Sequence, residues 1–189
     1  MRGVLAAFAA VLMCCGCVQA PAFSIADDAE DRFSPKERII QTKNNRLCAE
    51  NGATRAVKDG FFLDFAYAPD AKSAAITVLA TDKFDCAASR ANRYYALKQV
   101  ILLLDGRDRI AINLIGSLQS NVKPDCADTS EIAVGNIFIS DLEKIANAKK
   151  IEAKIIGANR AATFEGYYID EFFIPRTARF LETIRAAKN

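Results

Sequence analysis

The segment from Tyr94 to Leu118 constrains the fold of this 189-residue chain more than any other. It consists of two largely apolar stretches, 94–104 and 107–118, on either side of Asp105-Gly106. Asp-Gly readily adopts the positive φ angles that a tight turn between antiparallel strands requires. Alternation in the second stretch places Ile110, Ile112 and Leu114 on one face. The segment therefore predicts a β-hairpin.

Other parts of the chain show the same alternation of apolar and polar residues, which is typical of half-buried strands. Residues 61–67 and 74–80 flank the turn residues Pro69-Asp70, and residues 150–156 and 162–169 flank Gly157-Ala158-Asn159. Each of these pairs predicts another hairpin. Residues 132–139 predict a single strand.

Three segments predict helices. Ser34-Pro35-Lys36-Glu37 has the residues of a capping box, and a helix from there to about Cys48 would direct Ile39, Ile40 and Leu47 inward. Ser140-Asp141-Leu142-Glu143 forms a second capping box, before a short helix with Leu142, Ile145 and Ala146 inward. A last helix begins near Pro175, with Phe180, Leu181 and Ile184 on one stripe.

About seven strands, mostly in consecutive hairpins, and about three helices indicate an α+β fold. We expect a mainly antiparallel sheet with the helices packed on it, in a single domain over residues 34–189. Residues 23–33 contain Asp27, Asp28, Glu30 and Asp31 without the spacing of a calcium loop. This segment is therefore expected to be an acidic, solvated tether.

The N-terminus has the organisation of an export signal over residues 1–22. Met1-Arg2 precedes an apolar run from Val4 to Met13, which is too short to span a bilayer. The string Gly16-Cys17-Val18-Gln19-Ala20-Pro21 follows and resembles the start of bacterial lipoprotein precursors. The resemblance covers only this part of the chain.

The resemblance implies that the Cys17 thiol receives a diacylglycerol and that Cys17 becomes the first residue after cleavage. The lipoprotein pattern favours Leu three positions before that cysteine, where this chain has Cys14; Leu12-Met13-Cys14-Cys15 is an alternative lipobox. Cleavage after Ala22, in Ala20-Pro21-Ala22, is a further alternative and would give a soluble periplasmic protein. We expect a lipoprotein that is anchored in a bilayer of the cell envelope through its acyl group and faces the periplasm.

Export places the remaining cysteines, Cys48, Cys86 and Cys126, in an oxidising compartment. Opposite residues of an antiparallel pair have numbers with a constant sum, which is 211 for a turn at Asp105-Gly106 and 213 for one at Gly106-Arg107. Cys86 and Cys126 sum to 212. We predict a disulfide between them at the base of the hairpin, with Cys48 free.

The composition and the motifs point away from several classes of function. The chain has no histidine, which removes Ser-His-Asp catalysis and histidine metal sites, and its 25 basic and 23 acidic residues give no charge that would attract nucleic acid. No cofactor or nucleotide motif occurs, and three scattered cysteines do not form a metal site. We therefore predict no catalytic, cofactor-binding or metal-ligating residue.

Adjacent aromatic residues occur at 61–62, 94–95, 167–168 and 172–173, and neighbours on a strand point to opposite faces of a sheet. The second ring of each pair is either covered by a helix or exposed to bind a partner. The expected function is a non-enzymatic envelope lipoprotein that binds an unknown envelope protein or ligand. The alternatives are an envelope hydrolase that uses carboxylates such as Glu165, Asp170 and Glu171, and a soluble periplasmic inhibitor or immunity-type protein.

Overall fold

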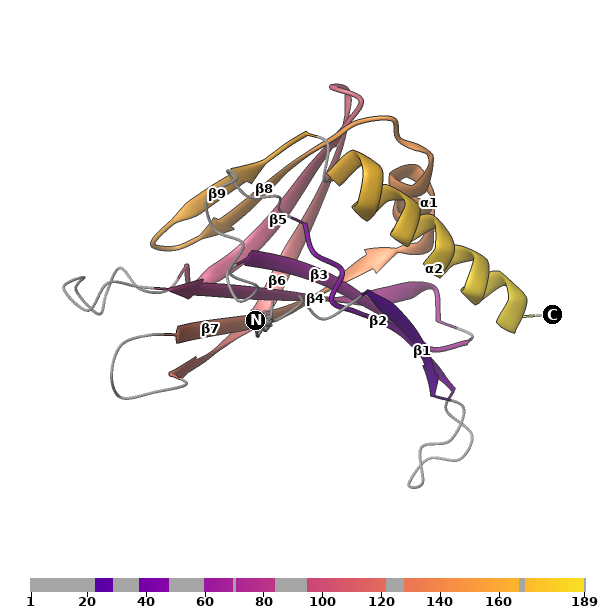
Figure 1. Ribbon diagram of the computed structural model, residues 1–189, viewed down its shortest axis with the longest axis horizontal. Helices are drawn as coiled ribbons and strands as arrows, with labels where there is room; N and C mark the ends of the chain where they lie inside the picture. Colours follow the sequence, from indigo (N-terminus) through magenta and orange to yellow (C-terminus); the bar gives the residue numbers. More distant parts are fainter. Residues whose placement is uncertain are drawn as a thin grey trace, which may run out of the picture.

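The computed structural model describes residues 23–28, 38–47, 60–69, 71–83, 95–121, 128–166 and 169–188. In these ranges the chain forms a nine-stranded sheet in the order β1-β2-β3-β4-β7-β6-β5-β8-β9, and every pairing is antiparallel (Figure 1). The strands are β1 (Ser24–Asp28), β2 (Ile39–Lys43), β3 (Gly60–Tyr67), β4 (Ser73–Lys83), β5 (Leu97–Leu104), β6 (Asp108–Asn121), β7 (Asp128–Phe138), β8 (Ile151–Gly157) and β9 (Ala161–Phe164). The helical elements are α1 (Ile139–Asn147), the π-helical turn η2 (Ile169–Phe173) and α2 (Ile174–Ala187).

The predicted α+β class and the antiparallel sheet are confirmed, but the described residues form nine strands and two α-helices in place of about seven and three. The predicted helix over 34–48 is wrong, because its described part contains β2. Ile40 and Thr42 of β2 are buried and alternate with more accessible neighbours, and β1 and β3 supply backbone partners on both sides. β-Branched residues favour such a strand once these partners are in place.

Residues 24–28, which the sequence assigns to the acidic tether, form the edge strand β1. β1 pairs with β2 over five positions, from Ser24 opposite Lys43 to Asp28 opposite Ile39. Ile25 packs against the core of the domain. The first part of the expected tether therefore belongs to the sheet.

The predicted central hairpin is confirmed as β5 and β6, with a three-residue turn at Asp105-Gly106-Arg107. Asp105 and Gly106 have φ angles of 49° and 70°. β5 and β6 pair only as far as Gln99 and Asn113. Beyond that point β6 pairs with β7, and the register shifts between Ile115 and Leu118, beside Gly116 with φ 67°. One bent strand thus joins two halves of the sheet.

The hairpin does not continue toward residues 86 and 126, so it cannot place the two cysteines opposite each other as predicted. β4 instead pairs with β7 along its whole length, from Ser73 opposite Phe138 to Lys83 opposite Asp128. The remaining predicted hairpins are confirmed as β3–β4 and β8–β9, although β9 ends at Phe164 and residues 169–173 form η2.

The core lies between the inner face of the sheet and the two helices, which pack on the same side of it (Figure 1). Phe65 of β3 stacks on Phe180 of α2 at a ring distance of 5.7 Å and lies 6.1 Å from Phe173. Phe180, Leu181 and Ile184 of α2 are buried, as the predicted stripe requires. α1 begins at Ile139 without a side-chain cap, so the predicted capping box at Ser140 does not form.

Candidate functional site

The site residues predicted from the sequence lie outside the part of the chain that the structure describes. This holds for Cys17 in the export segment and for the proposed pair Cys86 and Cys126. Within the described ranges, no helix is long and apolar enough to cross a bilayer, and no cluster of histidine, cysteine or acidic residues could hold a metal ion.

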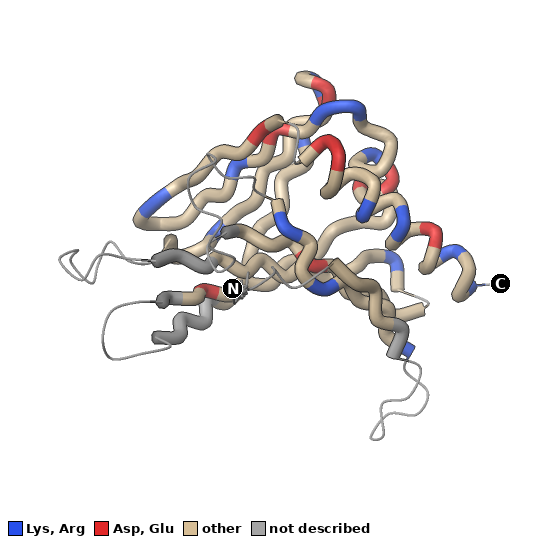
Figure 2. Tube along the Cα trace, viewed as in Figure 1, with Lys and Arg blue, Asp and Glu red and all other residues tan. Residues whose placement is uncertain are grey.

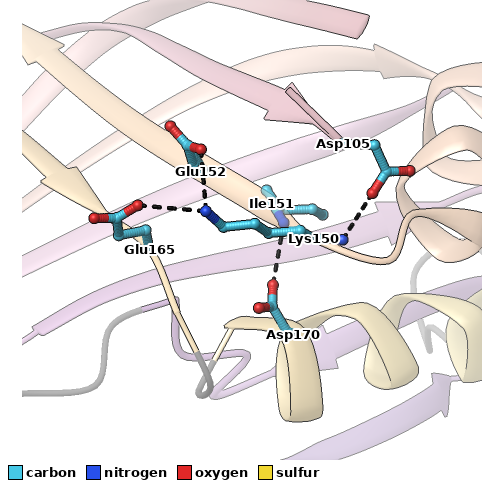
Figure 3. A network of polar contacts seen from close by, with 6 residues as sticks. All are labelled: Asp105, Lys150, Ile151, Glu152, Glu165 and Asp170. Carbon is cyan, nitrogen blue, oxygen red and sulfur yellow. Dashed lines mark hydrogen bonds and ion pairs between the residues drawn. The ribbon is translucent and has the colours of Figure 1, made fainter. Parts of the chain in front are cut away.

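Two of the three carboxylates considered for acid–base chemistry, Glu165 and Asp170, are engaged with separate partners (Figure 3), and Glu171 is exposed. Asp170 accepts a hydrogen bond from the backbone N–H of Ile151 at 3.1 Å. Glu165 faces the ammonium group of Lys150 at 3.7 Å, and Glu152 lies 3.3 Å from the same group. The hydrogen bond to Glu152 raises the pKa of Lys150, with further attraction from Glu165. These residues therefore tie β8, β9 and η2 together.

Asp105, at the tip of the central hairpin, is also used structurally. Its carboxylate accepts hydrogen bonds from the backbone N–H groups of Lys149 and Lys150, each at 2.9 Å. Figure 3 shows the contact with Lys150. Its own N–H donates to the carbonyl of Lys150. The charged turn thereby fixes the connection between α1 and β8.

Glu131 of β7 is a buried carboxylate that the sequence analysis did not select. It is 2% exposed and accepts hydrogen bonds from three consecutive backbone N–H groups: Tyr95 at 2.8 Å, Ala96 at 3.2 Å and Leu97 at 2.6 Å. Ala96 has a φ angle of 52°, which is uncommon for a residue with a Cβ atom. Glu131 therefore holds the start of β5 in an unusual conformation and links the two halves of the sheet.

The alternation of residues in β7 indicates from the sequence that residue 131 points inward. Residue 131 shares the inward face with Ala133 and Ile137, both of which are buried. An acid at such a position needs buried hydrogen-bond donors. The sequence does not show where those donors come from, because residues 95–97 are more than thirty positions away.

A second polar cluster connects β2 and β3. Thr42 donates its hydroxyl to Asp64 at 2.9 Å and accepts the N–H of Phe65 at 2.8 Å, while Asn45 donates its backbone N–H to Asp64 at 3.0 Å. Burial raises the pKa of Asp64 above its ordinary value of 3.8, and the hydrogen bonds from Asn45 and Thr42 oppose that rise. The cluster fixes the edge of the sheet next to β1.

An open depression of about 670 Å³ lies at the C-terminal end of α2. Its described lining consists of Pro69, Ala71, Lys72, Ile139, Ala187 and Lys188. Two lysines supply the charge of this described lining, and no carboxylate is among these six residues.

The outer face of the sheet, opposite the helices, exposes apolar side chains on neighbouring strands. The four most relevant are Ile115 (74% exposed), Phe138 (65%), Val134 (44%) and Ile132 (39%), which we call the outer patch. Ile115 of β6 lies opposite Val134 of β7, and Ile132 lies opposite Leu79 of β4. The exposed side chains of the outer patch thus lie on the paired strands β6 and β7, and the half-buried Leu79 of β4 lies next to them.

Comparisons with protein families, with curated proteins and with solved structures found no match for this chain. The choice of a candidate site therefore depends on the geometry alone. Among the features of the described residues, the outer patch differs from the polar clusters because its side chains are exposed and have no structural task inside the core.

The aromatic pairs that suggested a second face do not form the outer patch. Phe61 and Phe62 are both buried, and Phe173 is buried in η2 beside the partly exposed Phe172. Tyr94, Tyr167 and Tyr168 lie outside the described residues. The exposed apolar surface is instead mainly aliphatic and comes from β6 and β7.

Proposed function

We propose that this protein is a non-enzymatic lipoprotein of the bacterial cell envelope that binds another envelope protein through the outer patch. An acyl group on Cys17 would anchor it in the bilayer, with the domain facing the periplasm. The observation that carries the binding part is the row of exposed apolar side chains on the central strands β6 and β7.

The position of the outer patch favours protein binding. β7 is hydrogen-bonded on both sides, to β4 and to β6, so the backbone that carries Ile132 and Val134 is held in place without a partner. A pre-organised surface loses little conformational entropy when it binds. Burying a fully exposed apolar side chain is worth about 1.5 to 3 kcal/mol, and the patch side chains, which are 39% to 74% exposed, would each gain the corresponding part of that value. Together they form an apolar centre of the kind on which interfaces depend.

The charge distribution supports the same choice of face. Charged residues are frequent along α2 and near the tip of the β5–β6 hairpin (Figure 2). The outward positions at the middle of β7 are Ile132, Val134 and Asn136, none of which carries a charge. Interface centres are depleted in charged residues compared with the remaining surface.

Site-specific photocrosslinking in the native cell tests the binding surface. A photoreactive residue in place of Ile115 should give a defined adduct with a larger protein, and the same probe in place of Arg179 on α2 should not. Val134→Lys should abolish the adduct at position 115 without unfolding the domain, because Val134 is partly exposed. An adduct only from position 179, or one that persists at position 115 in the Val134→Lys variant, would refute the assignment.

Metabolic labelling with a fatty acid tests the anchor separately. The wild-type protein should incorporate the label and remain with the membrane fraction. Cys17→Ser should lose the label and accumulate as precursor, whereas Cys48→Ser should behave as the wild type. Unlabelled wild-type protein in the soluble fraction would show that cleavage after Ala22 is used instead.

A further inference from the structure

We infer that one corner of the domain, formed by Phe23, Phe172 and Arg176, rests on the surface of the bilayer. We call it the anchor corner. The inference deepens the proposed function, because it rests on the acylation of Cys17. It assigns this corner as a lipid-contacting surface and thereby fixes which side of the domain faces the membrane.

The length of chain between the lipid and the sheet is the first argument. Only residues 18–22 separate Cys17 from Phe23, and β1 begins at Ser24. Six Cα–Cα steps of at most 3.6 Å reach about 22 Å. An acylated Cys17 lies at the membrane surface, so Phe23 stays within about that distance of it. A tether over residues 23–33 would have allowed a much larger separation.

The second argument is that Phe23 does not hang freely from the domain. The strand that follows it pairs with β2 over five positions, and β2 pairs with β3 through Ile40 and Gln41. The guanidinium of Arg176, in the first turn of α2, lies 5.0 Å from the Phe23 ring and 5.5 Å from the Phe172 ring. The entry point of the chain is thus fixed beside the N-terminal end of α2.

The chemistry of the anchor corner suits the interfacial region of a bilayer. Phe side chains of peripheral membrane proteins are buried at the boundary between headgroups and acyl chains, and a guanidinium pairs well with lipid phosphate while its stem remains against apolar groups. Phe172 is 37% exposed. Glu171 is exposed beside it, and Arg179 is exposed on the following turn, so the net positive charge of the corner is small. The rings, more than the charge, are expected to provide the contact.

This orientation is compatible with the outer patch as a protein-binding surface. α2 packs on the inner face of the sheet, whereas Ile132 and Val134 lie on the outer face. A domain that touches the bilayer next to the start of α2 keeps β6 and β7 accessible from the periplasm. The membrane contact and the partner contact therefore use different surfaces.

Tryptophan fluorescence can test the inference directly, because the chain contains no tryptophan. The acylated mature protein, which begins at Cys17, is reconstituted in phosphatidylcholine–phosphatidylglycerol vesicles whose acyl chains carry bromine near the headgroup. Phe172→Trp should be quenched at least twofold relative to vesicles without bromine. Val134→Trp, on the outer face, is the matched control and should be quenched by less than a tenth. Phe23→Trp provides a second probe of the same corner.

The outcomes separate the two proposals. Flotation of the protein with the vesicles, lost in Cys17→Ser, reports acylation independently of orientation. If the protein floats and the Phe172→Trp and Phe23→Trp variants are unquenched, or if Val134→Trp is quenched equally, the anchor corner is wrong while the lipoprotein assignment stands. If the wild-type protein does not float, both fail.

The contribution of Arg176 is tested in the Phe172→Trp background. Adding Arg176→Gln should reduce the quenching of the indole at position 172 while leaving flotation unchanged, because the guanidinium that pairs with lipid phosphate is gone. Equal quenching with and without Arg176 would remove that residue from the contact.

Discussion

Replacing Glu131 by glutamine should destabilise the domain strongly, although it changes only one atom of the side chain. The carboxylate accepts two N–H groups at one oxygen and the N–H of Leu97, at 2.6 Å, at the other. The amide of glutamine has one oxygen, so its NH₂ group must face at least one of these donors. A lost hydrogen bond to a charged group costs about 1.5 to 3 kcal/mol, and an unpaired buried donor costs about 1 to 3 kcal/mol. Because these costs overlap, we expect Glu131→Gln to lower the free energy of unfolding by about 3 kcal/mol.

Urea unfolding followed by circular dichroism, with the protein lacking residues 1–22, measures this change. The matched control is Glu143→Gln, which removes the charge of a half-exposed carboxylate that lies 2.9 Å from Arg185. Exposed ion pairs contribute little, so the control should lose no more than about 0.5 kcal/mol. If Glu131→Gln stays within about 0.5 kcal/mol of the wild type at an unchanged denaturant slope, Glu131 does not hold β5 as we describe.

Three further changes test other parts of the structure. Burial raises the pKa of Asp64 in the folded state above its ordinary value of 3.8, so the free energy of unfolding should fall as the pH rises from 3.8 through the raised pKa. Urea titrations across acidic pH should show that the Asp64→Asn variant lacks this fall. If the variant has the same pH dependence as the wild type, the assignment is wrong. A Cβ atom at Gly157 would overlap the backbone carbonyl of Tyr95, so Gly157→Ala should lower the free energy of unfolding by about 3 kcal/mol in the same assay. A decrease of less than about 1 kcal/mol would show that the start of β5 can move away from the added methyl group. If the predicted disulfide forms, Cys86 and Cys126 should not be alkylated without reductant, and the disulfide should raise the free energy of unfolding by about 2 to 4 kcal/mol. Mass spectrometry that finds both thiols alkylated would exclude it.

The structure changes the argument for that disulfide without testing it. Lys83 and Asp128 are opposite each other at the end of the β4–β7 ladder. Cys86 follows Lys83 by three residues, and Cys126 precedes Asp128 by two. Both cysteines are therefore close in sequence to one paired end of this ladder. The pairing of β4 with β7 is therefore a better reason for the prediction than the central hairpin.

Local patterns in the sequence were sufficient for the hairpins and for the two α-helices. The Asp105-Gly106 turn and the stripe of Phe180, Leu181 and Ile184 need only neighbouring residues to be recognised. β2 was missed because the residues that precede it in the sequence resemble the start of a helix. Its pairing with β1 and β3 forms only in the folded sheet and cannot be recognised from the neighbouring residues. Tertiary pairing overrides a local preference of this kind.

The sequence of β7 also contains an indication of the outer patch. Residues 132–138 are largely apolar at both odd and even positions, which is typical of a strand that is covered on both faces. The helices cover only the inner face, so Ile132, Val134 and Phe138 remain exposed. The sequence thus indicates a strand that is apolar on both faces, but only the placement of α1 and α2 shows which face is open.

The strand order also has a consequence for how the domain folds. Among the described strands, most pairings join neighbours in the chain, and only β4–β7 and β5–β8 join distant strands. Ser73 and Phe138, for example, must meet across 64 intervening residues. Closing long loops is entropically costly and slows folding. The hairpins β3–β4, β5–β6 and β8–β9 are therefore expected to form early, with the rate of folding set by the later closure of β4 along β7.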